Sequence, residues 1–337
     1  MDIQGEYLIK AYDNLNYKKC EKKLKKFLTE STYFNLFSCP DFLRYHLYSD
    51  NSLNNYRFYD LIIENKLNIF CHLPGAINDK SQYFESHIGS SFSGPCFIRN
   101  LKLSEKYKII DNIIRHFQSI DIKKIIFRIP PSFYFNDDND SIEELEFLLY
   151  TMGFSVSKCD LNVVINLKNI NRKKILSSFS RNIRRNYKVA ESNQLQMKLT
   201  TDINTFYSIL EKNREKFKVK PTHTLMNLEY IKSQFPNHVL FFLLFKENIP
   251  IAGLCSFQVT KKVLNVFYLC HEQSSEANKP CDYLMVKFID WAINNEFELI
   301  DLGPNNLNYE INYGLLKFKM GFNGITKIRK RYQLLIS

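Results

Sequence analysis

Short runs of alternating apolar and polar positions, separated by stretches with helical spacing, make up the first half of the chain. The runs at 56–63 and 67–75 predict two strands that form a hairpin across Glu64-Asn65-Lys66. The segment 86–98 is rich in Gly and Ser and predicts a loop followed by a strand. The other expected elements are helices at 17–31 and 104–118, a strand at 122–131 that two prolines end, and a helix from Asp140 or Ser141 to Gly153.

The second half has a more regular pattern. After a strand at 161–167, the expected elements are helix 173–190, strand 195–200, helices 203–217 and 224–234, strands 238–245, 251–259 and 263–270, helix 281–296, strand 297–303, helix 310–320 and a last strand at 327–336. From Leu195 onward this order is similar to that of the GNAT acyltransferases, whose mixed sheet is splayed open between its fourth and fifth strands.

A faint internal repeat suggests that this fold occurs twice. A strand, a three-residue turn that begins Glu-Asn and a second strand occur around Glu64-Asn65-Lys66 and again around Glu247-Asn248-Ile249. We therefore expect an α/β protein (α+β, with mixed sheets) of two tandem GNAT-like domains. The domains are predicted at 1–165 and 166–337, each with a mixed, mainly antiparallel sheet flanked by helices.

Charge and composition narrow the choice of partner. The formal net charge of +11 and the pI of about 9.1 favour an anionic partner such as phosphate, nucleic acid or membrane headgroups, although Lys, Asn and Ile are all abundant, as genome bias would also produce. The longest apolar run, Val239 to Phe245, is far shorter than the roughly 20 residues of a membrane helix. The N-terminus does not resemble a signal peptide, and the eight cysteines are scattered without a CxxC pair. We expect a cytoplasmic protein with reduced thiols and no metal site, and leave peripheral membrane contact and oligomeric state open.

The helix predicted at 173–190, in the basic segment 172–190, has two distinct faces. At about 100° per residue, its cations lie on one side and its apolar residues on the other. The cations are Lys173, Lys174, Arg181, Arg184, Arg185 and Lys188, and the apolar face holds Ile175, Leu176, Phe179, Ile183, Tyr187 and Ala190. A helix that is merely solvated usually mixes charges, whereas no Asp or Glu is interleaved here. The pattern leaves two interpretations, a solvated face or an anion-binding surface.

A lysine on an apolar face marks the end of the chain. On the helix predicted at 310–320, with Ile311 at zero, Lys319 falls near 80° between Leu315 and Leu316, whereas Lys317 falls near 240°. An ammonium in that position must be paired, extend outward to water, or face a cleft that receives negative charge. The preceding strand ends at Asp301 and Gly303, where polar residues are well placed to meet a ligand.

These segments carry a resemblance to a known group. "FSRNIRRNYKVA", "KPTHTL", "IPIAGLCSF", "DLGPNN" and "GLLKFKMGFNG" resemble the FemABX-type peptidyltransferases and BioF2-like acetyltransferases, which have two tandem GNAT domains. The similarity covers nearly the whole chain in order and length, with its specific motifs between about 172 and 332. It implies that Phe318 and Lys319 stabilise the transition state of acyl transfer. Two departures are "FKMGF", in which the glycine is shifted, and "DLG" in place of the commoner "DFG".

A further departure concerns the donor. GNAT enzymes that use acetyl-CoA usually hold its diphosphate in a glycine-containing loop after the fourth strand, whereas here that connection, "HEQSSEANKPCDYL", has no glycine. We expect an N-acyltransferase with an acyl-CoA-type donor that is held differently here. The alternative is a FemABX-type transferase that uses an aminoacyl-tRNA, which the basic helix and the positive charge would suit. No cofactor is expected besides this co-substrate.

The resemblance implies direct attack by an acceptor amine on the donor carbonyl, with an amino sugar, glycan precursor or other cell-envelope precursor as acceptor. Lys319, Phe318 and Asp301 are the expected catalytic residues, with Asp301 and His271 as candidate bases. Arg181, Arg184, Arg185 and Lys188 are expected to bind the donor, and Tyr268, His271, Asn305 and Asn306 the acceptor. The alternative from another class is a non-catalytic RNA-binding or scaffold protein on a GNAT pair.

Overall fold

The C-terminal strand takes part in both units of the fold. The computed structural model describes residues 7–12, 21–48, 55–86, 88–135, 141–168, 170, 175–307 and 309–336. It divides into one unit of Met1–Cys159 with Arg329–Ser337 and a second of Asp160–Ile328. Residues 329–337, predicted in the second domain, belong to the first unit, where Tyr332 to Leu335 pair with Phe127 to Lys124.

The first unit contains two groups of strands. One is antiparallel, in the order β1-β3-β4-β7, and the other runs β17-β8-β6-β5-β2, in which only β6 and β8 are parallel. The strands are β1 (Leu8–Tyr12), β2 (Tyr56–Phe58), β3 (Asp60–Glu64), β4 (Ile69–Leu73), β5 (Gly75–Asn78), β6 (Tyr83–Ser86), β7 (Cys96–Phe97), β8 (Lys124–Phe127) and β17 (Ile325–Leu335). The helices are α1 (Glu21–Glu30), α2 (Pro40–Leu43), α3 (Leu103–Ser119) and α4 (Ile142–Thr151), with 3-10 turns η2 (Leu36–Ser38), η3 (Arg44–Tyr48) and η4 (Ser132–Tyr134).

Helices α3 and α4 close the core of this unit as their apolar spacing predicts. Ile109, Ile110 and Ile113 of α3 are fully buried against the sheet, and Ile114 packs beside them. Helix α4 begins after Ser141, whose hydroxyl accepts a hydrogen bond from the Glu143 amide at 3.0 Å. The predicted start of this helix at Asp140 or Ser141 is therefore observed at Ser141.

The second unit has the order of elements predicted from Leu195 onward. Its sheet runs β10-β11-β12-β13-β14-β9, with β13 and β14 parallel and the other pairs antiparallel. The strands are β9 (Ser155–Asn166), β10 (Gln196–Thr200), β11 (Val239–Lys246), β12 (Ile249–Gln258), β13 (Val263–His271) and β14 (Leu299–Pro304), with a small hairpin of β15 (Asn306–Leu307) and β16 (Glu310–Ile311). The helices are α5 (Ile175–Ser178), α6 (Arg181–Glu191), α7 (Ile203–Glu215), α8 (Leu225–Gln234), α9 (Pro280–Asn294) and α10 (Tyr313–Met320), with a 3-10 turn η6 (Gln273–Asn278).

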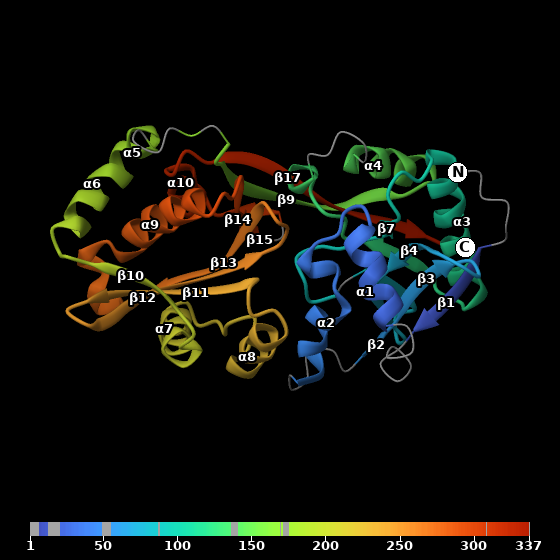
Figure 1. The fold of residues 1–337 in the computed structure, drawn as a ribbon, viewed down its shortest axis with the longest axis horizontal. Helices are drawn as coiled ribbons and strands as arrows, with labels where there is room; N and C mark the ends of the chain where they lie inside the picture. Colours follow the sequence, from blue (N-terminus) through green and yellow to red (C-terminus); the bar gives the residue numbers. More distant parts are fainter. Residues whose placement is uncertain are drawn as a thin grey trace. The chain divides into compact units, whose positions relative to one another are not determined.

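Both faces of this sheet are covered, which explains the unbroken apolar run of β11. Phe241 packs on Phe206 of α7 with ring centroids 5.0 Å apart, and its neighbour Phe242 packs on Phe288 of α9 at 5.3 Å. Successive strand residues point to opposite faces. In Figure 1, α7 and α8 accordingly lie on one side of the sheet, and α6 and α9 on the other.

The basic segment forms two helices rather than one. Arg172, Lys173 and Lys174 lie outside the described residues. The helical conformation is interrupted at Phe179 and Ser180, between α5 and α6. The Arg184 guanidinium donates to the carbonyls of Ser177 at 3.0 Å and Phe179 at 2.8 Å, which supplies donors for the end of α5. As a result Leu176, which was placed on the apolar face of a single helix, is 36% exposed.

Helix α10 ends directly against the start of α6. The Ser180 amide donates to the Gly321 carbonyl at 2.8 Å, and the Phe179 and Phe322 rings lie 5.8 Å apart. A Cβ added at Gly321 would lie only 2.8 Å from Ile183 Cγ1 and 3.1 Å from Ser180 Oγ. The glycine of "FKMGF" therefore permits the contact between the two helices.

We predict that Gly321→Ala destabilises the protein by about 1–3 kcal/mol, because the added methyl group overpacks the contact with Ile183. Gly314→Ala, on the same helix, is the matched control, since its Cβ would meet only Asn312 Oδ1 at 3.5 Å. Alanine is favoured over glycine in helices by about 0.5–1 kcal/mol, so this control is expected to be neutral or stabilising. Urea unfolding measures both, and equal midpoints for the two variants would contradict the prediction.

Candidate functional site

Strands β13 and β14 are paired over only three residues and then separate. Their parallel register runs from Val263 opposite Leu299 to Asn265 opposite Asp301, after which β13 continues to His271. On its other side β14 pairs with β9, and a bulge lies between Asp301 and Pro304. The carboxyl end of β14 is thus released from β13 at Asp301, the kind of position at which open sheets bind ligands.

Asp301 is held at this point by buried asparagines. It is 1% exposed, and Asn162 of β9 donates through Nδ2 to both carboxylate oxygens at 3.1 Å. The Gly303 amide donates to Oδ1 at 2.8 Å, and Asn265 of β13 donates to the Asp301 carbonyl at 3.4 Å. Sequence analysis missed both asparagines, although each is a lone polar residue within an apolar strand, "LNVVINL" and "VLNVFYLC".

Lys319 lies inside the fold and is bound to the end of β14. Its Nζ donates to the carbonyls of Gly303 at 3.1 Å and Pro304 at 2.9 Å, and the residue is 9% exposed. Gly303 has a φ of 73° and no atom within 4 Å of an added Cβ, so glycine is needed there for its backbone conformation rather than for space. The neighbouring Lys317 is exposed, as the helical wheel predicted.

Burial lowers the pKa of Lys319 to about 8, and the nearby Asp301 charge opposes this shift. At neutral pH the side chain is therefore mainly an ammonium, with two of its three hydrogens bound by carbonyls in the described part of the chain. An ammonium with one hydrogen to spare in a largely desolvated place is suited to an oxyanion.

Phe318 is half-buried and packs on the core rather than on Lys319. Its ring lies 5.1 Å from that of Phe322, which is fully buried. Phe318 thus anchors α10 and, with it, the position of Lys319.

Asn305 and Asn306 hold the turn after β14 to β9. Asn305 Nδ2 donates to the Leu161 carbonyl at 2.9 Å, and Asn306 Oδ1 accepts from the Leu161 amide at 2.8 Å. The Oδ1 atoms of Asn305 and Asn162 are buried and receive no hydrogen bond from any described residue. Pro304, next to Asn305, pairs with Asn162 in the register of β14 and β9, so both acceptors lie at the same end of β14.

Tyr268 and His271 are not in contact with the Asp301–Lys319 pair. Tyr268 is buried, and its hydroxyl accepts from the His223 amide at 3.0 Å and contacts His223 Nδ1 at 2.9 Å. His271, at the end of β13, contacts Cys281 Sγ through Nδ1 at 3.4 Å, and burial lowers its pKa. The structure thus gives both residues partners elsewhere in the unit.

The four cations of α6 differ in their contacts. Arg181, Arg184, Arg185 and Lys188 are all exposed, and none forms an ion pair with a carboxylate among the described residues. Arg184 donates to carbonyls, as described above. Among the described residues, Arg185 donates one hydrogen bond, from Nη2 to Asn182 Oδ1 at 3.0 Å. Arg181, Arg185 and Lys188 remain available to an anion.

The N-terminus of α9 corresponds to the place where GNAT enzymes usually hold a diphosphate, and here residues of the chain itself occupy it. The preceding connection forms η6, Lys279 takes the left-handed conformation with a φ of 52°, and Pro280 has no amide hydrogen to offer. The Asp282 carboxylate lies in the first turn of α9 and accepts from Asn186 Nδ2 at 3.1 Å, and burial raises its pKa. A negative group built in at this end would repel a diphosphate.

Comparison with known proteins bears on the fold. No model of a protein family matches the sequence, and no curated protein matches it significantly. Among solved structures, FemX is similar with a TM-score of 0.69 at 11% identity, over 97% of each chain. L-PGS from Bacillus licheniformis has a TM-score of 0.59 at 12% identity, over 93% of this chain and 91% of that chain.

A tandem GNAT protein from the clavulanic acid biosynthesis pathway has a TM-score of 0.53 at 9% identity, over 98% of each chain. The chain has the tandem GNAT fold, as the order of elements predicted. Within the described ranges, no helix is long and apolar enough to cross a membrane. The same residues contain no group of three metal-binding side chains.

We predict that Lys319 makes stability depend on pH between about 8 and 10.5. Its folded pKa of about 8 lies below the ordinary value of 10.5, so the unfolded chain binds more protons in this window and folding becomes more favourable as pH rises. The gain relative to Lys319→Met is at most about 3 kcal/mol. Urea unfolding at pH 7.5, 9 and 10 measures it, with Lys317→Met as the exposed control. Parallel pH profiles for wild type and Lys319→Met would refute the prediction.

Proposed function

We propose that the protein transfers an acyl or aminoacyl group to a primary amine at the separated end of β14. The observation that carries the proposal is the buried Lys319 ammonium, bound to the Gly303 and Pro304 carbonyls beside Asp301. The tandem GNAT fold supports acyl transfer as the class of reaction.

In this proposal the residues around Asp301 have separate roles. The remaining hydrogen of Lys319 stabilises the oxyanion that forms when the amine attacks the donor carbonyl. The unpartnered oxygens of Asn162 and Asn305 accept hydrogen bonds from the attacking amine and orient it. The new C–N bond forms as the bond to the leaving group breaks, and the proton lost by the amine ends on the leaving atom.

Asp301 acts as a positioning residue in this scheme and not as the base. Its carboxylate already accepts hydrogen bonds from Asn162 and Gly303 and is almost fully buried. Both carboxylate oxygens are thus engaged within the protein, and the group is closed off from an attacking amine. It fixes the Asn162 amide and keeps the neighbouring lysine charged.

An aminoacyl-tRNA fits the second unit better than acyl-CoA. The Asp282 carboxylate and Pro280 occupy the helix end that would hold the CoA diphosphate, whereas Arg181, Arg185 and Lys188 form an exposed surface for a phosphate backbone. Helix α6 is also joined to α10, which carries Lys319, through Ser180 and Gly321. The acceptor we propose is an amine of a cell-envelope or glycan precursor, in keeping with the resemblance to FemABX-type enzymes.

The test is to incubate the protein with amine-bearing envelope precursors and either aminoacyl-tRNA or acetyl-CoA, and to measure product by mass spectrometry. We expect product with aminoacyl-tRNA. Product with acetyl-CoA alone would replace the proposed donor, and no product with either, despite tRNA binding, would favour the non-catalytic RNA-binding alternative.

In the same assay, we predict that Lys319→Ala lowers the rate of transfer about 10²- to 10³-fold while donor affinity stays near that of wild type. The reason is that the ammonium contacts the oxyanion, which is absent from the bound ground state. Lys317→Ala, on the exposed face of the same helix, is the control and should retain wild-type rates. Equal rates for the two variants would remove Lys319 from the mechanism.

We also predict that the triple variant Arg181→Gln, Arg185→Gln, Lys188→Gln binds tRNA more weakly and with a smaller dependence on salt. The slope of log affinity against log salt should decrease in magnitude by about 2–3, because three phosphate contacts are lost. Filter binding at several salt concentrations measures it. Lys22→Gln, Lys26→Gln is the control, since both lysines are exposed on α1 in the other unit. An unchanged slope in the triple variant would place the tRNA surface elsewhere.

A further inference from the structure

A second charged cluster lies in the first unit, at the carboxyl ends of its own parallel strand pair. Strands β6 and β8 run parallel, with Glu85 opposite Ile126, and both end within two residues of that pair. The chain then leaves β6 after Ser86 and continues from β8 into Arg128. This is the position in the sheet that favours ligand binding.

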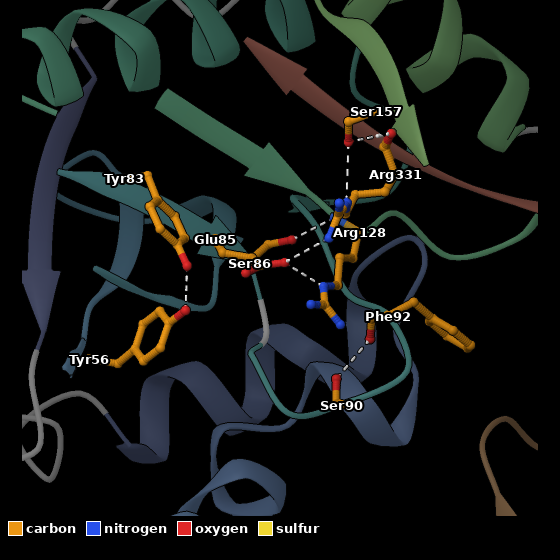
Figure 2. Close-up of polar contacts among 9 residues, drawn as sticks. All are labelled: Tyr56, Tyr83, Glu85, Ser86, Ser90, Phe92, Arg128, Ser157 and Arg331. Atoms are coloured by element: carbon orange, nitrogen blue, oxygen red, sulfur yellow. Dashed lines mark hydrogen bonds and ion pairs between the residues drawn. The ribbon is translucent and has the colours of Figure 1, made fainter. Parts of the chain in front are cut away.

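The charged residues share the face of the sheet that is turned away from the main core. Phe84, Phe127 and Tyr332 point into that core, and Phe127 is paired with Tyr332 across β8 and β17. Because side chains alternate along a strand, Glu85, Arg128 and Arg331 point to the opposite face. Figure 2 shows these three side chains meeting there.

One buried carboxylate holds two arginines. Glu85 Oε1 accepts from Arg128 Nε at 2.6 Å and lies 3.9 Å from Arg331 Nη1, with the Glu85 side chain 6% exposed. One arginine is enough to neutralise Glu85, so the cluster carries a surplus positive charge. Arg331 is also fixed by Ser157, whose Oγ accepts from Arg331 Nε and donates to the Arg331 carbonyl, each at 3.2 Å.

The terminal nitrogens of Arg128 are not used by this arrangement. The contact with Glu85 is made by Nε alone. The two terminal nitrogens make no hydrogen bond to any residue that the structure describes. The Arg128 amide is bound separately, to Ser86 Oγ at 2.9 Å. A guanidinium held along one edge presents its other donors in a fixed plane, which is the geometry that grips an oxyanion with two hydrogen bonds.

The loop after β6 is held beside Arg128. The Ser93 amide donates to the Arg128 carbonyl at 2.6 Å, and Tyr45 donates to the Gly89 carbonyl at 2.8 Å. Gly89 has a φ of 80°, a conformation that glycine adopts without strain. The Ser93 hydroxyl is fully buried and has no hydrogen-bond partner among the described residues. The loop thus brings a buried residue with an unsatisfied hydroxyl against the Arg128 backbone (Figure 2 shows its neighbours Ser90 and Phe92).

We propose that Arg128 and Arg331, positioned by Glu85, form a clamp for an oxyanion, either a phosphate or a carboxylate group of a ligand of the first unit. This site is independent of the proposed transfer reaction and of the cations on α6. The sheet brings its charged side chains together from three distant segments of the chain, at residues 85, 128 and 331.

The test is calorimetric titration of the full chain with inorganic phosphate and, separately, with succinate, at constant ionic strength. The protein carries Arg181→Gln, Arg185→Gln and Lys188→Gln, so that α6 does not compete for the anion. Arg331→Gln leaves Glu85 paired with Arg128, and Arg128→Lys keeps a charge beside Glu85 but loses the planar fork. We expect each of the two variants to weaken binding at least about tenfold, the loss of one charge-assisted hydrogen bond or more.

Arg115→Gln is the matched control, because Arg115 is an exposed arginine of the same unit, paired with Asp111 on α3, and its loss should leave affinity unchanged. Binding of phosphate alone would assign a phosphate ligand, and binding of succinate alone a carboxylate. The proposal is overturned if neither anion binds, if Arg331→Gln and Arg128→Lys both bind as the parent does, or if Arg115→Gln weakens binding as much as they do.

Discussion

Burying the Lys319 ammonium is costly unless its hydrogens meet acceptors, and the end of the second unit is built around this requirement. Two acceptors are backbone carbonyls at the end of β14, which reach Lys319 because the chain takes a left-handed turn at Gly303. Beyond Asp301, β14 no longer pairs with β13, and its pairing with β9 is shifted by a bulge before Pro304. The proposed site is therefore a consequence of how a charged side chain meets its hydrogen-bond partners inside the fold.

The need to bring the Lys319 ammonium to its acceptors also explains why α10 packs closely on α6 and β9. The helix must bring Lys319 to the strand end, and glycines permit the approach on two sides. A Cβ at Gly321 would collide with Ile183, and one at Gly324 would lie 2.4 Å from Val163 Cγ1 on β9. Phe318 and Phe322 fill the remaining space. The segment "FKMGFNG" thus combines one charged residue with the small and aromatic residues that allow it to be buried.

Sequence patterns predicted the elements of the second unit closely, because both sheet faces and the helices that cover them have clear apolar periods. They also separated Lys319 from Lys317, since that distinction depends only on helix geometry. They could not show that Asn162 and Asn265 surround Asp301, because strand order and register bring these residues together. The break at Phe179 was missed for a similar reason: Arg184 bonds to the carbonyls of the preceding turn, and no local pattern predicts that contact. Glu85 and Arg331 lie on β6 and β17, and Arg128 directly follows β8. These positions are far apart in the sequence, so no local pattern could predict the cluster.

The two units use the same feature of the fold with different charge balance. In each, charged side chains gather where a parallel pair of strands ends. In the second unit, a buried carboxylate and a lysine balance each other, which suits a reaction in which charge develops and then disappears. In the first unit, two arginines share one carboxylate and leave a permanent positive charge, which suits binding of an anion that stays charged. This difference is the reason to assign chemistry to the one cluster and binding to the other.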